Sequence, residues 1–331
     1  MKKMKLGATG PVVSAVGLGC MGMSGVYGPA DRAESISTIH AALDHGINLI
    51  DTADFYGMGH NEMLIGEALR GGRREQAVIS VKQGALRDPS GGWHGNDSRP
   101  LAIKNFLAYT LQRLGVDYID IYRPSRLDAA VPIEDTVGAI ADMVKAGYVR
   151  HIGLSEVGPS IIRRAAAVHP ISDLQIEYSL LSRDIEAAIL PTCRELHIGV
   201  TAYGILSRGL LGGQVKADSV LSKGDLRNAS PRFQGANRTA NLQLVSDLAA
   251  VAGRLGFSVA QIAVAWVAAQ GADIIPLIGT RRRDRLSEAL AALAKPLTPQ
   301  DLALVEAAVP KGAAVGDRYP SAKMAEVASD A

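Results

Sequence analysis

Short runs of aliphatic and β-branched residues alternate with amphipathic stretches along nearly all of this 331-residue chain. Parallel strands need a crossover connection of about a dozen or more residues between them, and that connection is usually a helix. The alternation therefore predicts consecutive βα units on a parallel sheet. Eight candidate strands can be counted, at residues 16–19, 47–51, 77–82, 118–122, 151–155, 174–178, 198–203 and 274–279.

The intervening stretches place apolar residues at three- and four-residue spacing, as amphipathic helices do. Pro132 and Pro159 stand at two of the expected starts, where a residue without an N–H fits the first helical turn. We expect helices that include 31–45, 99–115, 132–146, 159–168, 185–197 and 240–256.

Eight βα units close most economically into a (β/α)8 barrel, whereas an open doubly wound sheet usually has five or six strands. An open dinucleotide-binding sheet also carries a glycine fingerprint between its first strand and first helix. The nearest match, residues 17–22, is followed by more glycine-rich sequence instead of a helix, so it lacks that context. We therefore predict one α/β TIM-barrel domain over residues 1–331.

Three segments lie outside the repeated units. Residues 3–15 have a Gly-Ala-Thr-Gly turn between short apolar runs, which predicts a β-hairpin at the N-terminal end of the barrel. Residues 205–238, after the seventh strand, are too long for an ordinary connection, and we interpret them as a functional loop over a bound ligand. The tail at 311–331 shows little periodicity, and we expect it to be mobile at its end.

Composition excludes several classes of protein. The formal net charge is +2, and the basic residues are scattered apart from a cluster at 281–285, so no nucleic-acid partner is expected. Cys20 and Cys193 stand alone in apolar stretches, which predicts two buried thiols and no metal site. The chain shows neither a leader pattern nor a run long enough to span a membrane, so we expect a soluble cytoplasmic protein without a membrane partner.

Chemically useful side chains follow two neighbouring strands. Asp51 and Tyr56 follow the second expected strand, and Lys82 ends the third. The C-terminal ends of barrel strands meet at one mouth, so these groups are expected to converge. A lysine ammonium beside a phenol favours the phenolate, so we expect Lys82 to lower the pKa of Tyr56 while Asp51 orients the lysine. Tyr56 is then a candidate proton donor.

Several motifs resemble those of the aldo-keto reductases. They occur in the family's order along residues 3 to about 310, which makes the resemblance specific. The matching segments are Asp-Thr-Ala-Asp-Phe-Tyr-Gly at 51–57, Gly-Glu-Ala-Leu at 66–69, Gly-Leu-Ser at 153–155, Gln-Ile-Glu-Tyr-Ser at 175–179, Ala-Tyr-Gly-Ile-Leu-Ser-Arg-Gly at 202–209, and Ile-Gly-Thr-Arg-Arg at 278–282.

The resemblance implies a barrel that binds NADPH across its C-terminal mouth and passes the nicotinamide 4-pro-R hydride to a carbonyl carbon. Tyr56 would donate the proton to the carbonyl oxygen, with Asp51 and Lys82 tuning it. Ser155 and Gln175 would hold the nicotinamide carboxamide.

The resemblance also implies a cofactor groove. Tyr203 would stack on the nicotinamide ring, and 204–209 would line the pyrophosphate through backbone N–H groups and Arg208. Four arginines within 281–285 suit the 2′-phosphate, which favours NADPH over NADH. The expected cofactor-binding residues are Gly19, Met21, Asp51, Ser155, Gln175, Tyr203, Gly204, Leu206, Ser207, Arg208, Gly209, Ile278, Gly279, Thr280, Arg281, Arg285 and Glu288.

The chain departs from the family at one catalytic position. Ser125 stands where the family has a histidine that orients the carbonyl oxygen. We expect the shorter serine to leave room for a bulkier substrate or a bridging water, with His94 as a second candidate donor. The expected substrate pocket comprises Tyr27, Trp93, His94 and Arg126, beside the catalytic set Asp51, Tyr56, Lys82 and Ser125.

Two other functions stay open on the sequence alone. One is a cofactor-binding regulatory protein of the same fold with little turnover, similar to the potassium-channel β subunits. The other is a barrel lyase in which Lys82 forms a Schiff base. The sequence selects neither a particular carbonyl substrate nor the direction of the reaction, and it leaves open a homo-oligomer.

Overall fold

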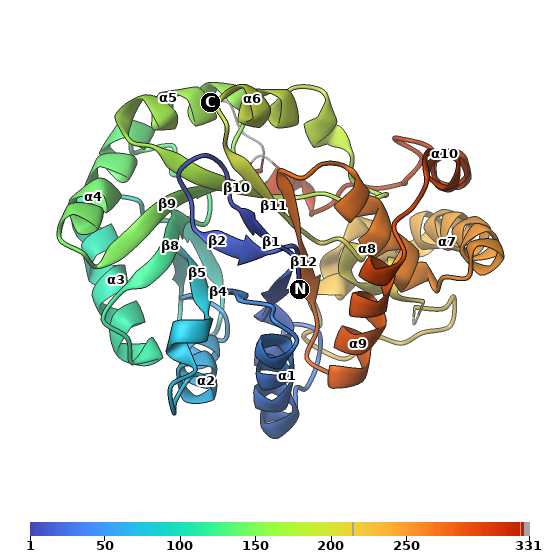
Figure 1. Ribbon diagram of the computed structural model, residues 1–331, viewed down its shortest axis with the longest axis horizontal. Coiled ribbons are helices and arrows are strands. Elements are labelled where there is room, and N and C mark those ends of the chain that lie inside the picture. Colours follow the sequence, from blue (N-terminus) through green and yellow to red (C-terminus); the bar gives the residue numbers. More distant parts are fainter. Residues whose placement is uncertain (214, 325, 328–331) are drawn as a thin grey trace.

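Eight parallel strands close into a barrel in the computed structural model, which describes residues 1–213, 215–324 and 326–327 (Figure 1). Around the barrel the strands follow the order β10-β11-β12-β3-β4-β5-β8-β9. All eight predicted strands are confirmed, and the fold is a (β/α)8 barrel. Their bounds are β3 Gly17–Gly19, β4 Leu49–Ala53, β5 Val78–Gln83, β8 Ile119–Pro124, β9 Val149–Ser155, β10 Ile171–Glu177, β11 Gly199–Tyr203 and β12 Ile274–Gly279.

Helices surround the barrel and bury their apolar faces against its outer surface (Figure 1). Five of the six predicted helices are present with ends shifted by up to five residues, and the helix expected at 185–197 is divided into two shorter pieces. The helices are α1 Arg32–Asp44, α2 His60–Ala68, α3 Pro100–Leu114, α4 Ile133–Lys145, α5 Pro159–Val168, α6 Ile189–Glu195, α7 Gly235–Leu255, α8 Val259–Ala269, α9 Arg283–Ala291, α10 Pro299–Ala308 and the short α11 Ser321–Met324.

The predicted N-terminal hairpin is confirmed. β1 (Lys3–Lys5) pairs antiparallel with β2 (Val12–Ser14), and Figure 1 shows the pair lying across one end of the barrel. Leu6 and Val13 are buried in one apolar cluster with barrel residues that include Leu49. The hairpin therefore closes the N-terminal end of the barrel, and ligands can reach the strand ends only from the opposite side.

Three segments differ in detail from the prediction. The helix expected at 185–197 is a 3-10 turn at Asp184–Glu186 followed by α6 from Ile189, because Pro191 suits only a first helical turn. The segment with Trp93 and His94, for which no strand was predicted, contains β7 (Trp93–Asn96), which pairs with β6 (Ala85–Arg87). In the long loop after β11, α7 begins at Gly235, five residues earlier than expected.

The beginning of the C-terminal tail makes specific contacts. Asn241 on α7 donates to the backbone oxygen of Val315 and accepts from its N–H, at 2.9 and 2.8 Å. Arg318 is buried, and Tyr319 is partly buried at the barrel mouth. The tail is therefore fixed at these points. The predicted mobility concerned the far end of the tail, and most of that end lies outside the described residues.

Two further predictions concern the described residues. Cys20 and Cys193 are both free and buried, as expected. No single helix in the described part of the chain is long and apolar enough to cross a membrane, although α7 and α8 pass that test together as a pair bent by 83°.

Candidate active site

An ion pair between neighbouring strands forms the centre of the site. Asp51 on β4 and Lys82 on β5 both lie at the C-terminal mouth, where Lys82 Nζ donates to Asp51 Oδ1 at 2.6 Å. Both side chains are almost completely buried. The pairing that the sequence predicted is therefore present. Burial lowers the pKa of Lys82, and the Asp51 carboxylate opposes that shift.

Two more donors fix the Asp51 carboxylate. Ser80 Oγ and Gln175 Nε2 both donate to Asp51 Oδ2, at 2.9 and 2.6 Å. Gln175 comes from β10, on another part of the barrel wall, so the carboxylate joins separate strands. The Gln175 side chain was expected to hold a nicotinamide carboxamide. In this structure its amide group instead donates a hydrogen bond to Asp51.

Tyr56 lies directly after β4, in a turn where Gly57, Met58 and Gly59 all have positive φ. Its ring centroid is 5.1 Å from Lys82 Nζ. The expected lowering of the Tyr56 pKa is wrong for this structure: burial raises it well above its usual value, and the Asp51 carboxylate adds to the shift. The main physical reason is burial, which disfavours the charged phenolate and outweighs the nearby Arg126 guanidinium, whose charge lowers the Tyr56 pKa.

A second ion pair, which sequence reasoning missed, lies inside the barrel and connects to the first. Arg123 and Asp173 are fully buried, with Arg123 Nη1 donating to Asp173 Oδ2 at 2.9 Å. Arg123 Nη2 also donates to Ser80 Oγ at 2.9 Å, and Ser80 in turn donates to Asp51. A continuous chain of bonds thus joins the interior ion pair to the Asp51–Lys82 pair. Charged residues within otherwise apolar strands were the only available signal.

Ser125 lies at the end of β8, buried, with its hydroxyl donating to Asn96 Oδ1 at 2.8 Å. Arg126 is partly buried beside it and donates to the backbone oxygen of Ser125 at 2.6 Å. The structure therefore places both residues at the mouth, and it adds Asn96 as a partner that sequence reasoning did not identify.

The two substrate-pocket candidates on the β6–β7 hairpin, Trp93 and His94, have different surroundings in the structure. Trp93 packs edge-on against Phe55 at 5.5 Å and lies between Arg87 and Lys323, so it borders the mouth. His94 is exposed and pairs with Asp88 at 2.7 Å. Because the His94 ring is engaged by an exposed carboxylate, this arrangement does not support His94 as the missing donor.

One buried hydroxyl is a candidate cofactor contact. Ser155 Oγ is among the buried side-chain atoms in the described part of the chain that have no hydrogen-bond partner. Buried polar groups are normally satisfied, so this hydroxyl is available for a ligand. Arg208 Nη2 also has no hydrogen bond, but it lies 3.5 Å from Glu177 Oε2 in an ion pair. Ser155 ends β9, where a carboxamide was expected, and Arg208 lies in the loop after β11, where a phosphate was expected.

The backbone of that loop is tightly turned. Ser207, Arg208 and Gly209 all have positive φ, at 46°, 56° and 97°. The N–H groups of Ser207 and Gly209 donate within the loop, to the backbone oxygens of Gly204 and Leu206 at 2.7 and 2.8 Å. Of the groups expected to meet a pyrophosphate, the Arg208 guanidinium is therefore the better candidate in this structure.

The arginine cluster opens α9, and its members have different partners. Arg281 donates to the backbone oxygen of Gly28 at 2.8 Å and so holds the loop that contains Tyr27. Arg285 pairs with Glu288 at 2.7 Å, and Glu288 accepts from Ser258. Arg282 and Arg283 are paired with acids and largely exposed.

The other expected cofactor residues gather near the junction of the first and last barrel strands. β12 pairs with β3, which sets Gly279 beside Gly19, and no atom lies within 4 Å of a Cβ built on Gly279. Burial raises the pKa of Tyr27 to about 12. The remaining predicted positions around the mouth are Met21, Tyr203, Gly204, Leu206, Ile278 and Thr280.

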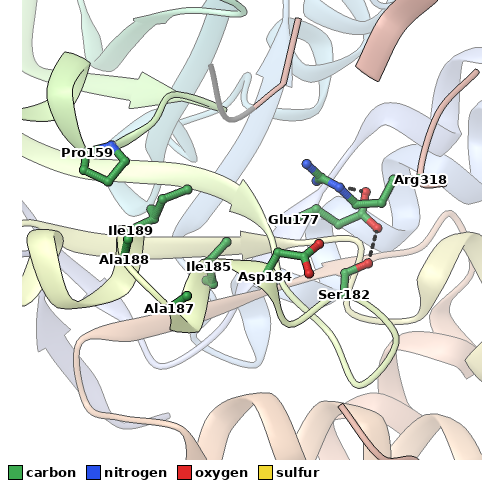
Figure 2. Close-up of a pocket in the computed structure, with 9 residues that line it drawn as sticks. All are labelled: Pro159, Glu177, Ser182, Asp184, Ile185, Ala187, Ala188, Ile189 and Arg318. Atoms are coloured by element: carbon green, nitrogen blue, oxygen red, sulfur yellow. Dashed lines mark hydrogen bonds and ion pairs between the residues drawn. The ribbon is translucent and has the colours of Figure 1, made fainter. Parts of the chain in front are cut away.

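Glu156 and Glu177, at the ends of β9 and β10, organise the neighbouring part of the mouth. Glu156 Oε1 accepts from the Tyr203 hydroxyl at 2.8 Å, and Arg318 holds the Glu156 pKa below its usual value. Glu177 Oε1 accepts from Ser182 at 2.9 Å. Figure 2 shows Glu177, Ser182 and Arg318 together on one side of a pocket of about 230 Å³, with Ile185 and Ile189 on its apolar side.

Comparison with known proteins agrees with this geometry. Residues 15–310 match the model of the aldo/keto reductase family. The chain belongs to this family. A probable aldo-keto reductase from Glycine max is 41% identical over 322 residues, which are 96% of this chain and 92% of that protein.

Solved structures of aldo-keto reductases have the same architecture. A glycerol dehydrogenase from Gluconobacter oxydans has a TM-score of 0.83 at 32% identity, over 92% of this chain and 94% of that one. A thermostable aldo-keto reductase in complex with the inhibitor epalrestat has a TM-score of 0.73 at 26% identity, over 93% and 100%. Aldo-keto reductases reduce carbonyl groups with a nicotinamide cofactor, so the chain is an oxidoreductase of this kind.

Proposed function

We propose that this aldo-keto reductase uses NADPH to reduce an aldehyde or ketone to the alcohol, with Tyr56 as the proton donor. The observation that carries the proposal is the buried Asp51–Lys82 pair beside the Tyr56 ring at the barrel mouth. The buried Ser155 hydroxyl, which has no hydrogen-bond partner, and the Arg208 guanidinium support the binding of a nucleotide in the same mouth.

NADPH would supply a hydride to the carbonyl carbon when bound. Ser155 would hold the carboxamide, Tyr203 the face of the nicotinamide ring, and Arg208 in the loop after β11 the pyrophosphate. Arg281 and Arg285, at the N-terminal end of α9, would meet the 2′-phosphate, where guanidinium groups and the helix dipole both favour a dianion. This grouping supports NADPH over NADH.

Tyr56, Lys82 and Asp51 would control the proton that is transferred to the carbonyl oxygen. Because burial keeps the Tyr56 pKa high, the phenol holds its proton at neutral pH and can give it to a substrate oxygen that gains negative charge. The phenolate that forms is then stabilised by Lys82, the nearest ammonium. Asp51 holds Lys82 in place through the 2.6 Å bond, and Ser80 and Gln175 fix Asp51.

The proposal is tested by cofactor binding and turnover. NADPH and NADH binding are measured by quenching of intrinsic fluorescence. NADPH oxidation is then followed against a panel of aldehydes and ketones, and NADP⁺ reduction against glycerol. We expect tighter binding of NADPH than of NADH.

The matched variant for this test is Tyr56→Phe, which keeps the ring and removes the proton. We expect it to bind NADPH as the wild type does, while turnover falls by about 100-fold or more, the scale of a lost general acid. NADPH binding by the wild type without turnover of any carbonyl would favour the regulatory alternative. Unchanged turnover in Tyr56→Phe would contradict the role of Tyr56.

A further inference from the structure

The first part of the C-terminal tail, residues 315–324 (the C-terminal segment), crosses the barrel mouth and is anchored on both sides. On the α7 side, Asn241 bonds the backbone of Val315, and Arg232 Nε donates to the backbone oxygen of Gly316 at 3.1 Å. On the opposite side, Lys323 Nζ lies 4.2 Å from the ring centroid of Trp93. The segment therefore spans the opening between the loop after β11 and the β6–β7 hairpin.

Arg318 ties the middle of the segment to the barrel. Its Nη2 and Nη1 donate to the two carboxylate oxygens of Glu156 at 3.0 and 3.2 Å, and Nη1 lies 3.5 Å from Glu177 Oε2. Both glutamates and the arginine are buried, and Figure 2 shows the Arg318 side chain beside Glu177. A bidentate arginine–carboxylate contact of this kind fixes the orientation of the Arg318 side chain as well as its position.

Tyr319 follows Arg318 and reaches the groups that the proposed function gives to the cofactor. Its hydroxyl lies 3.0 Å from the hydroxyl of Tyr203. The Arg208 guanidinium lies 4.2 Å from the Tyr319 ring centroid, and Arg208 Nη1 donates to the backbone oxygen of Arg318 at 2.6 Å. Arg126 Nη2 also faces the Tyr319 hydroxyl, at 3.5 Å.

We propose that the C-terminal segment is an internal ligand of the cofactor groove and that it leaves the groove when a nicotinamide dinucleotide binds. The inference rests on the proposed function, because Tyr203 and Arg208 receive their cofactor roles there. Pairing of a pyrophosphate with Arg208 requires the guanidinium that the Tyr319 ring and the Arg318 backbone oxygen now occupy. Tyr319 also bonds the hydroxyl of Tyr203, the residue on which the nicotinamide ring would stack. The segment and the dinucleotide therefore compete.

The competition sets the apparent affinity for the cofactor. A protein whose binding-competent state is only partly populated binds with an affinity reduced by that fraction. Removing the contacts of Tyr319 should populate the open groove, so NADPH should bind about 3- to 10-fold more tightly than to the wild type. A segment that instead folded over the bound cofactor as a cover would give the opposite sign.

The test compares NADPH dissociation constants of full-length variants by fluorescence titration. Tyr319→Ala should tighten binding, and Tyr319→Phe, which keeps the ring over Arg208 and loses the hydroxyl, should lie between Tyr319→Ala and wild type. Asp317→Asn is the matched control, since Asp317 is in the same segment with an exposed side chain. It should bind NADPH as the wild type does.

Hydrogen exchange provides a second readout that does not depend on activity. Addition of NADPH to the wild type should raise amide exchange in 315–324 and leave the N-terminal hairpin at 3–14 unchanged. Equal or weaker NADPH binding by Tyr319→Ala, or slower exchange in 315–324 with NADPH, would overturn the inference while leaving the proposed function intact. Absence of NADPH binding by both wild type and Tyr319→Ala would overturn both.

Discussion

At the residue scale, the position of Ser125 bears on how a substrate oxygen would be bound. Its hydroxyl proton is directed to Asn96, so the serine has no free donor for a carbonyl in this arrangement. A histidine at the same position would reach farther into the mouth and present a ring N–H. The proposed function therefore separates substrate choice, at this position, from proton donation, which it assigns to Tyr56.

Replacement of Ser125 by histidine tests this separation. We expect Ser125→His to raise kcat/KM for small aldehydes by about 10- to 100-fold, the scale of one added donor at a developing oxyanion. Ser125→Ala serves as the control, since it removes the hydroxyl without adding a donor, and should change kcat/KM little. Steady-state kinetics on folded Ser125→His with no gain for any small aldehyde would contradict this account.

Asp54, in the turn after β4, gives a residue-scale prediction about pH. Burial raises its pKa to about 7, and Glu62 adds to the shift. In the unfolded chain this carboxyl loses its proton near pH 4, whereas the folded protein keeps the proton up to about pH 7. Ionisation of Asp54 therefore lowers the free energy of unfolding as the pH rises from 4 to 7, by up to about 4 kcal/mol in total. Above pH 7 it lowers the free energy of unfolding no further.

The variant Asp54→Asn removes this titration while keeping the shape of the side chain. We expect Asp54→Asn to have the higher free energy of unfolding at pH 8, with the difference shrinking as the pH falls toward 4. Denaturant unfolding at several pH values measures this. A difference that is constant across the range would mean that Asp54 does not titrate as proposed.

At the scale of elements, the barrel strands are held by charge as well as by apolar packing. Arg123 on β8 and Asp173 on β10 form an ion pair inside the barrel, and Thr201 on β11 donates to Asp173 at 2.5 Å. Even a Cβ on Gly153, on β9 between β8 and β10, would meet Asp173 Oδ1 at 2.7 Å. Glycine is thus required there by close approach.

Arg123→Met should therefore destabilise the protein by about 3–5 kcal/mol, because it leaves the Asp173 carboxylate buried without its partner. The matched control is Arg164→Met, which breaks an ion pair with Glu134 in which both side chains are almost half exposed. That loss should be at most about 1 kcal/mol. Thermal or denaturant unfolding measures both, and similar losses for the two variants would contradict a special role for the interior pair.

At the scale of the whole molecule, local sequence determined most of what could be predicted. The eight strands follow from short apolar runs such as 274–279, and the site from polar residues at strand ends, because both signals lie within a few neighbouring residues. Contacts between distant segments left no such signal. Tyr319 meets Tyr203 across 116 positions, and Arg318 meets Glu156 across 162, so the course of the tail could not be foreseen.

The same limit explains the errors at the site. The interior chain of Arg123, Ser80 and Asp51 depends on which strands become neighbours on the closed barrel, and this appears only in the fold. The pKa of Tyr56 was misjudged because the sequence shows that Lys82 is near but not how deeply the phenol is buried beside the Asp51 carboxylate.

The hairpin at the N-terminal end of the barrel has a practical consequence for handling the protein. Met1 and the lysines at 2, 3 and 5 are exposed on that side, while the C-terminal segment runs across the reactive mouth. An affinity tag or a solid support attached at the N-terminus would leave the mouth facing the bulk solution. A label attached within residues 315–324 would instead lie beside the opening through which ligands pass.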